Sequence, residues 1–193
     1  MKYHKIITLK NGMECCLRNA AQQDGQLVLD NFNLTHAQTD YLLTYPDENS
    51  FDAAQESRFL KEKSDSEKEI ELIAAVNGAV IGTAGIEAVG TKYKVRHRAE
   101  FGISVLKEFW GLGAGWSLMT SCIECAKTAG YSQLELIVAA ENKRALSMYE
   151  KAGFVEYGRN PKGFRSRMTG FQEIVYMRLE LENENAFDSQ IVS

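Results

Sequence analysis

The stretch of residues 99–127 constrains the fold most, because it combines a strand, a glycine-rich turn and a helix. Residues 101–106 are mostly apolar, which predicts a strand buried on at least one face. The turn WGLGAG follows at residues 110–115, and residues 116–127 then place apolar side chains at helical spacing. The glycines therefore stand at a joint between a strand and a helix.

Glycines at such a joint have two uses. They adopt backbone angles that are closed to other residues, and they let an anion approach the backbone. The first N–H groups of a helix have no partner inside it, and the helix dipole adds partial positive charge. The joint therefore predicts a phosphate or pyrophosphate site. A tight connection that binds nothing explains the glycines alone equally well.

Two known phosphate-binding motifs do not match this turn. The Walker motif requires a Lys-Ser or Lys-Thr pair at the end of the loop, and no such pair is present. The dinucleotide motif GxGxxG, counted from Gly111, would place its third glycine where Trp116 stands. The glycine that is present, Gly115, comes one position too early. Neither nucleotide-binding motif therefore matches this turn, although a P-loop nucleotide binder stays a third alternative.

A third pattern fits the turn. Trp110, Gly113 and Gly115 occupy the three specified places of Gln/Arg-x-x-Gly-x-Gly/Ala, with Trp110 departing from the first place. Residues 142–154 match a second pattern, N-x-x-A-x-x-x-Y-x-x-x-G-F. With both patterns in the right order, the chain resembles the GNAT superfamily of N-acetyltransferases. The departure at Trp110 leaves the detailed loop geometry open more than the ligand.

This resemblance implies an α/β fold of GNAT type, with a mixed, mostly antiparallel sheet of about seven strands flanked by helices on both faces. We expect a single domain over residues 1–182, which agrees with a length of 193 residues and 45% hydrophobic content. The polar residues 183–193 are expected to form a frayed C-terminal tail.

Local signals predict several individual elements. The dipeptides Asn11-Gly12 and Asn77-Gly78 predict two hairpin turns. One helix is predicted at residues 35–44 with Thr35 as its cap, and another at residues 51–63, beginning after Ser50.

The C-terminal part is predicted to hold a strand at residues 133–139 and a last pair of strands at residues 154–158 and 173–181. The intervening residues 159–172 are rich in Gly, Arg and Lys and are predicted to be a loop.

The resemblance also implies which residues contact acetyl-CoA. In GNAT proteins the strand before the glycine loop is splayed from its neighbour, so its free backbone groups hold the pantetheine arm, while loop amides hold the pyrophosphate. An asparagine that also caps the next helix lies near the pantetheine. The predicted contacts are Ile103, Ser104, Val105, Gly111, Leu112, Gly113, Ala114, Gly115, Trp116 and Asn142.

Two residues are candidates for the proton transfers. Tyr149 matches the family tyrosine that points at the coenzyme sulfur, and a phenol with a pKa of about 10 is protonated at neutral pH. It is alternatively a packed helical tyrosine. Glu100 lies where some family members carry a glutamate that removes the amine proton, directly or through water. A one-residue slip in strand register would send its side chain to the other face.

The aromatic residues of the region that covers the acceptor in the family are ambiguous. Phe32, Tyr41, Tyr45 and Phe51 either line a substrate pocket or pack between helices.

Charge and composition exclude other classes of protein. The net charge of -4 gives no general attraction to nucleic acid or to an anionic membrane. Neither a membrane-spanning run nor a secretory signal is recognised, so we expect a cytoplasmic protein. Cys122 and Cys125 form a CxxC pattern on the predicted helix, where small buried side chains are the better interpretation than a metal site. No metal is expected.

The sequence therefore predicts an N-acetyltransferase that transfers an acetyl group from acetyl-CoA to a primary amine of a small molecule or an exposed protein or peptide amine. The alternative is a non-catalytic acyl-CoA-binding or sensing module that kept the fold. The acceptor amine, the base and the oligomeric state stay open, with a homodimer as one option.

Overall fold

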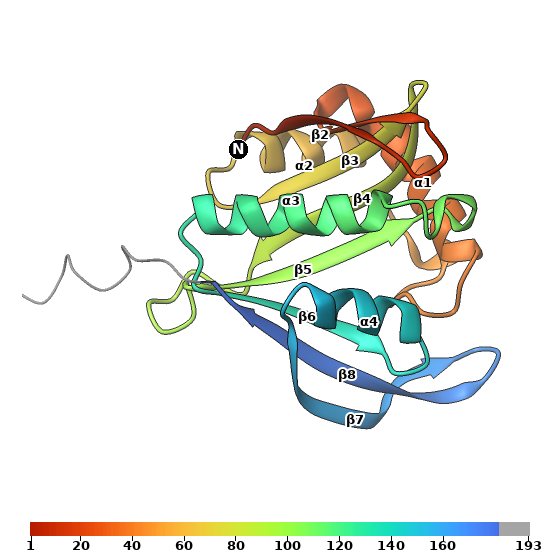
Figure 1. Cartoon of the computed structure of the whole chain (residues 1–193), viewed down its shortest axis with the longest axis vertical. Coiled ribbons are helices and arrows are strands. Elements are labelled where there is room, and N and C mark those ends of the chain that lie inside the picture. Colours follow the sequence, from red (N-terminus) through yellow and green to blue (C-terminus); the bar gives the residue numbers. More distant parts are fainter. Residues whose placement is uncertain (182–193) are drawn as a thin grey trace, which may run out of the picture.

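A computed structural model describes residues 1–181 of the chain, in which eight strands form one sheet (Figure 1). The strand order is β1-β2-β3-β4-β5-β6-β8-β7, and all neighbours are antiparallel except the parallel pair β5 and β6. The strands are β1 (His4–Thr8), β2 (Glu14–Asn19), β3 (Ile70–Val76), β4 (Ala79–Ala88), β5 (Arg98–Val105), β6 (Gln133–Ala139), β7 (Val155–Ser166) and β8 (Gly170–Glu180). The mixed sheet is confirmed, with one strand more than the expected seven.

Four α-helices cover the two faces of this sheet, as expected. They are α1 (Gly25–Ala37), α2 (Ala53–Asp65), α3 (Ala114–Thr128) and α4 (Lys143–Lys151). Figure 1 shows α3 and α4 on the face nearest the viewer, with α1 and α2 behind it. On β3, Leu72 joins the core under α3, whereas its neighbour Ile73 packs in a second core with Leu60 of α2. Successive side chains of β3 thus pack into the cores on opposite faces of the sheet. None of the four α-helices in residues 1–181 is long and apolar enough to cross a membrane.

Both predicted hairpins form, but only Asn77-Gly78 makes the expected two-residue turn, because residues 9–13 separate β1 from β2. Asn77 and Gly78 both have positive φ, at 50° and 84°, which is the arrangement that a two-residue turn between twisted strands requires. Gly12 likewise has φ of 86° between β1 and β2.

The sheet opens between its two parallel strands. β5 and β6 pair only where Arg98, Ala99 and Glu100 face residues 133–135. Beyond Glu100 the two strands diverge, as Figure 1 shows, although β5 continues to Val105 and β6 to Ala139. The C-terminal part of β5 therefore has no hydrogen-bonded partner on this side, and the divergence creates the space for the site.

The prediction of a helix at residues 35–44 is wrong. The helix α1 ends at Ala37, and the supposed cap Thr35 lies in its last turn, where its hydroxyl donates to the backbone oxygen of Asn31 at 2.9 Å. Asn31 is itself buried and donates to the backbone oxygen of Val80 at 3.0 Å. The buried stripe of α1 is partly polar, so the apolar pattern does not reveal the helix.

The second helix is displaced by two residues from its prediction and begins after Asp52 rather than Ser50. The Asp52 side chain accepts from the Gln55 N–H, and the Gln55 side chain accepts from the Asp52 N–H, both at 2.8 Å. This reciprocal capping box fixes the start of α2.

The predicted loop at residues 159–172 is also wrong, because β7 continues to Ser166 and forms a long hairpin with β8. Pairing shifts between Asn160 and Phe164, so Pro161 lies in an irregularity where no ladder hydrogen bond is required. Gly163 is in close contact with Ile174, since a Cβ at its position would lie 2.1 Å from an Ile174 side-chain carbon. Pro161 and Gly163 are typical of loops, but here they lie in a bulged strand. The predicted tail at residues 183–193 lies outside the described residues.

Candidate functional site

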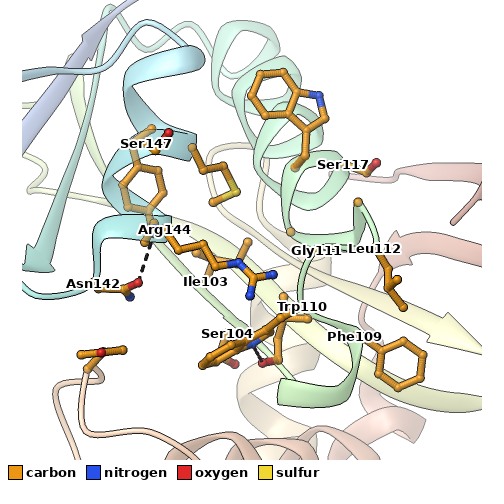
Figure 2. A pocket seen from close by; sticks show the side chains of 18 of the residues that line it. Ile103, Ser104, Phe109, Trp110, Gly111, Leu112, Ser117, Asn142, Arg144 and Ser147 are labelled. Carbon is orange, nitrogen blue, oxygen red and sulfur yellow. Dashed lines mark hydrogen bonds between the residues drawn. The ribbon is translucent and has the colours of Figure 1, made fainter. Parts of the chain in front are cut away.

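A cavity of about 610 Å³ lies where the open end of β5, the loop after it and α4 meet (Figure 2). This volume is in the range of small-molecule sites. The predicted contacts Ile103, Ser104 and Val105 line it from β5, and Asn142 lines it from the start of α4. The structure therefore brings together residues that are about forty positions apart in the sequence.

The glycine loop forms one wall of this cavity. Gly111 and Gly113 have φ of 81° and 103°, which residues with a side chain rarely adopt. Gly113 is the N-cap residue of α3 and supplies no side-chain cap. The first N–H groups of this 15-residue helix are therefore open to an anion.

Most of the predicted loop residues line the cavity: Gly111, Leu112, Gly113, Gly115 and Trp116. Ala114 differs from them, because its side chain is fully buried in the core and only its backbone can face a ligand. The loop is held from a distant part of the chain, since the Lys10 N–H donates to the Leu112 oxygen at 2.9 Å.

Trp110, which departs from the family pattern, has a definite role in the loop. Its indole Nε1 donates to the backbone oxygen of Val105 at 2.6 Å. The Arg144 guanidinium lies over the Trp110 ring, 5.1 Å from its centre, as Figure 2 shows. Trp110 thus ties the loop to the end of β5 and to α4, which answers the question of loop geometry that the sequence left open.

Three cationic side chains line the cavity, and none of them is among the contacts predicted from the sequence. They are Lys10, Arg144 and Lys151. Among the described residues none of the three forms an ion pair, and no acidic side chain lines the cavity. Their positive charge is therefore free to attract the phosphate groups of a ligand. Of the three, only Arg144 lies within a sequence motif, two residues after Asn142 in the second pattern.

The start of α4 carries Asn142 as predicted. Its side-chain oxygen accepts from the Ala145 N–H at 3.2 Å, so Asn142 is the helix cap and also a lining residue of the cavity.

Tyr149 also reaches the cavity, although its side chain is only 6% exposed. Its ring packs edge-on against Phe101, with centroids 6.3 Å apart. Burial raises the pKa of Tyr149 above its ordinary value, so the phenol is protonated at neutral pH. Its hydroxyl makes no hydrogen bond to another residue in the described range 1–181, which leaves its proton available to a ligand atom.

Glu100 does not line the cavity. It is exposed, and it points to the side of β5 opposite to the buried Phe101. Ser104, which does line the cavity, is four residues further along the same side of β5, or about 13 Å along the strand. The carboxylate therefore faces the α1 side of the sheet, and its role as base stays a prediction.

The four ambiguous aromatic residues have different roles. Tyr41 lines the cavity together with Leu42. Phe32 stacks on His36 with ring centroids 3.6 Å apart, and burial lowers the pKa of His36. Phe51 packs against Phe59, with centroids 6.1 Å apart. Tyr45 donates a hydrogen bond to Asp40 at 2.9 Å.

The interpretation of Cys122 and Cys125 as small buried side chains is confirmed. Both are free and buried in the core between α3 and the sheet, and burial raises the pKa of Cys125 to about 11. Within residues 1–181, no group of three or more His, Cys, Asp or Glu side chains is placed to hold a metal ion.

Comparison with known proteins identifies the family. The sequence model for the acetyltransferase (GNAT) family matches residues 34–154, which is more than half of the chain. The chain belongs to the GNAT family. An L-amino acid N-acetyltransferase of Escherichia coli, AaaT, is 32% identical over 93 residues, which cover 48% of this chain and 57% of that protein. The chain spans about half the length of the curated relatives it matches.

Solved structures agree with this assignment over a longer range. A GNAT-family acetyltransferase from Streptococcus pneumoniae is 27% identical, has a TM-score of 0.82, and is matched over 86% of this chain and 99% of that chain. A Salmonella typhimurium protein described with its cofactor acetyl-CoA is 18% identical and has a TM-score of 0.77. The match covers 91% of this chain and 98% of that chain. The second likeness concerns the fold alone. The GNAT fold that the sequence predicts is therefore confirmed.

Proposed function

We propose that this chain is an acetyl-CoA-dependent N-acetyltransferase that acts on a primary amine of a small molecule or on an exposed protein or peptide amine. The observation that carries the proposal is the opening between β5 and β6, which lies beside the uncapped N-terminus of α3. A splayed strand offers backbone groups to an extended arm, and the helix N-terminus offers N–H groups to a pyrophosphate. Membership of the GNAT family supports the same activity.

The residues present fit acetyl-CoA. The cavity has room for a pantetheine arm, and its three cations have no acidic partner within residues 1–181. In this proposal the amides of residues 111–116 and the side chain of Arg144 hold the pyrophosphate, and residues 103–105 hold the arm. Acetyl-CoA would supply an activated acetyl thioester to the site.

The chain's own groups then serve the transfer. The acceptor amine must be neutral to attack the thioester carbon directly in a ternary complex. Backbone N–H groups of β5 stabilise the charge that grows on the carbonyl oxygen. Tyr149 donates its phenolic proton to the departing sulfur. Glu100 accepts the proton of the amine through a chain of water molecules, because its carboxylate lies outside the cavity lining.

The alternative is a non-catalytic acyl-CoA-binding module of the same fold. Tyr149 favours the enzyme, because a binding module needs no proton donor at the cavity, and within residues 1–181 no residue hydrogen-bonds the Tyr149 hydroxyl. The two functions differ in turnover and not in affinity for acetyl-CoA.

The deciding experiment measures coenzyme A release with a thiol reagent across a panel of amines, with acetyl-CoA binding recorded in parallel. The panel includes L-amino acids, because the Escherichia coli relative is named for them, together with polyamines, aromatic amines and peptides with free amino groups. Turnover with one class supports the enzyme. Tight binding without turnover supports the binding module, and absence of binding refutes the acyl-CoA site.

A Glu100→Gln variant tests the base. If Glu100 removes the amine proton, kcat falls by about 10²-fold and the acidic limb of its pH profile changes. The control is Asp30→Asn, which also removes one exposed carboxylate. Asp30 does not line the cavity and accepts a hydrogen bond from Gln26. An unchanged kcat for Glu100→Gln would assign proton removal to water.

A further inference from the structure

The carboxylate of Asp40 collects hydrogen bonds from the tip of the β7–β8 hairpin. Its Oδ2 accepts from the Ser166 hydroxyl at 2.6 Å, the Gln172 amide at 3.0 Å and the Thr169 hydroxyl at 3.3 Å. Its Oδ1 accepts from the Tyr45 hydroxyl at 2.9 Å. Burial acts to raise the pKa of Asp40, but the hydrogen bonds outweigh it and hold the pKa below its ordinary value. Asp40 is therefore ionised at neutral pH, and we call these five residues the Asp40 cluster.

The segment that carries Asp40 depends on this cluster for its conformation. Residues 38–45 contain no helix or strand. Within the described residues, no backbone N–H of residues 39–44 donates to a backbone carbonyl. At the other end of the segment, the Gln38 side chain accepts from the Lys107 N–H at 2.8 Å. The segment is thus tied by side chains to the loop after β5 and to the hairpin.

A weaker contact on the outside of the hairpin supports the same connection. The Arg167 N–H donates to the Tyr45 hydroxyl at 2.9 Å, and the Arg167 guanidinium pairs with Asp47 at 2.8 Å. Both charged side chains of this ion pair are more than half exposed, so it contributes little. Asp40, with four side-chain donors, is the centre of the connection.

The neighbours of Asp40 in the sequence line the cavity. Thr39, Tyr41 and Leu42 form the part of its lining that we call the acceptor wall. The wall presents a hydroxyl, an aromatic ring and an aliphatic group, with no charge. The charged lining residues are Lys10, Arg144 and Lys151, and all three are cations.

We propose that Asp40 is a positioning residue that holds the acceptor wall in place, and that this wall selects amines whose body is apolar or aromatic. The inference rests on the proposed acetyl transfer. An amine carried on an apolar body would bury that body against Tyr41 and Leu42. A compact or multiply charged amine gains nothing from the wall, because no carboxylate in the described lining would pair with a second cation.

The test compares Asp40→Asn with the wild-type chain. The substitution keeps the side-chain volume, removes the charge and places an amide group among hydrogen-bond donors. We expect KM for phenethylamine to rise about tenfold, the effect of losing one charge-assisted interaction, while kcat changes less than about twofold. KM for putrescine and the dissociation constant of acetyl-CoA should stay unchanged. Asp30→Asn is the matched control.

A second variant guards against a general loss of folding. Ser166→Ala removes the shortest hydrogen bond to Asp40 from the other side of the cluster. If the two residues act as one unit, the double variant raises KM for phenethylamine no further than Asp40→Asn alone. Hydrogen–deuterium exchange of residues 38–45 should become faster in both variants, with melting temperatures close to the wild type.

Three outcomes would overturn the inference. The first is an equal rise in KM for phenethylamine and putrescine, and the second is additive effects in the double variant. The third is unchanged exchange of residues 38–45 in Asp40→Asn. Absence of turnover by the wild-type chain would refute the proposed acetyl transfer and with it the acceptor role, whereas the exchange measurement would still decide whether Asp40 holds the segment.

Discussion

The indole Nε1 of Trp110 donates a 2.6 Å hydrogen bond to the backbone oxygen of Val105, the last residue of β5. Trp110 is the one specified position at which the glycine loop departs from the GNAT pattern, and Val105 lies where β5 has already lost its β6 partner. The indole N–H of Trp110 therefore fixes the glycine loop against the end of β5.

Trp110→Phe should weaken acetyl-CoA binding. Phenylalanine keeps an aromatic ring under Arg144 but leaves the part-buried Val105 oxygen without its donor, a loss of about 0.5–1.5 kcal/mol. We expect the dissociation constant of acetyl-CoA, measured by calorimetry, to rise about tenfold. Tyr93→Phe is the control, because Tyr93 is exposed and lies before β5, at the end away from the glycine loop. An unchanged dissociation constant would remove the role assigned to the Trp110 N–H.

Arg144→Gln should also weaken acetyl-CoA binding, but through charge. Arg144 lies beside the glycine loop and has no acidic partner in residues 1–181, so its charge is available to phosphate groups. We expect a rise in the dissociation constant of about 5- to 20-fold at low salt and a smaller rise at 0.5 M NaCl, because salt screens the attraction. Lys127→Gln, an exposed cation at the far end of α3, controls for net charge. An effect independent of salt would contradict an electrostatic role.

Local chemistry explains why much of the site could be predicted from the sequence. The glycines of the loop, the cap at Asn142 and the strand at residues 133–139 each depend on neighbours within a few positions. The turns at Gly12 and Gly78 also need only their own backbone angles. These features form wherever the local sequence permits them, so the pattern alone identifies them.

Features that depend on distant partners could not be predicted. Asp40 meets Ser166 across 126 positions, and the Lys10 N–H meets the Leu112 oxygen of the glycine loop across about a hundred positions. The sequence predicts a loop at residues 159–172, where β7 and β8 in fact continue their hairpin, because the bulge there contains Pro161 and Gly163, residues that favour turns. Tertiary pairing overrode local preference there.

Tyr149→Phe should separate catalysis from binding. If the phenol protonates the departing sulfur, kcat falls by about 10- to 100-fold while the dissociation constant of acetyl-CoA changes little. Burial raises the pKa of Tyr149, so the phenol stays protonated well into the alkaline range. The wild-type kcat should therefore show no decline between pH 7 and 9 from loss of this proton. A variant with unchanged kcat would return Tyr149 to the role of a packed aromatic residue.

Glu71 on β3 should make the stability of the fold depend on pH. Burial raises the pKa of Glu71 to about 7, against the attraction of Lys63 and the hydrogen bond from Thr83, while Glu56 and Glu87 raise it further. Its carboxylate packs against Gly85 of β4, so closely that a Cβ there would lie 2.2 Å from Oε2.

The sign of this effect follows from proton binding. Between its ordinary pKa of 4.5 and the folded value of about 7, Glu71 binds a proton more often in the folded chain than in the unfolded chain. The free energy of unfolding should therefore fall as the pH rises through this range, by roughly 3 kcal/mol in total, and level off above pH 7. Urea unfolding at pH 5, 6, 7 and 8.5 measures the trend.

Glu71→Gln removes the titrating group while keeping its shape, so the fall in stability between pH 5 and 7 should largely disappear. At pH 8.5 the variant should be more stable than the wild type, because no charge is buried beside Gly85. Glu67→Gln, at an exposed carboxylate just before β3, should leave the wild-type trend unchanged. If Glu71→Gln instead kept the full pH dependence, the buried proton would have to reside on another group, and the assignment to Glu71 would be wrong.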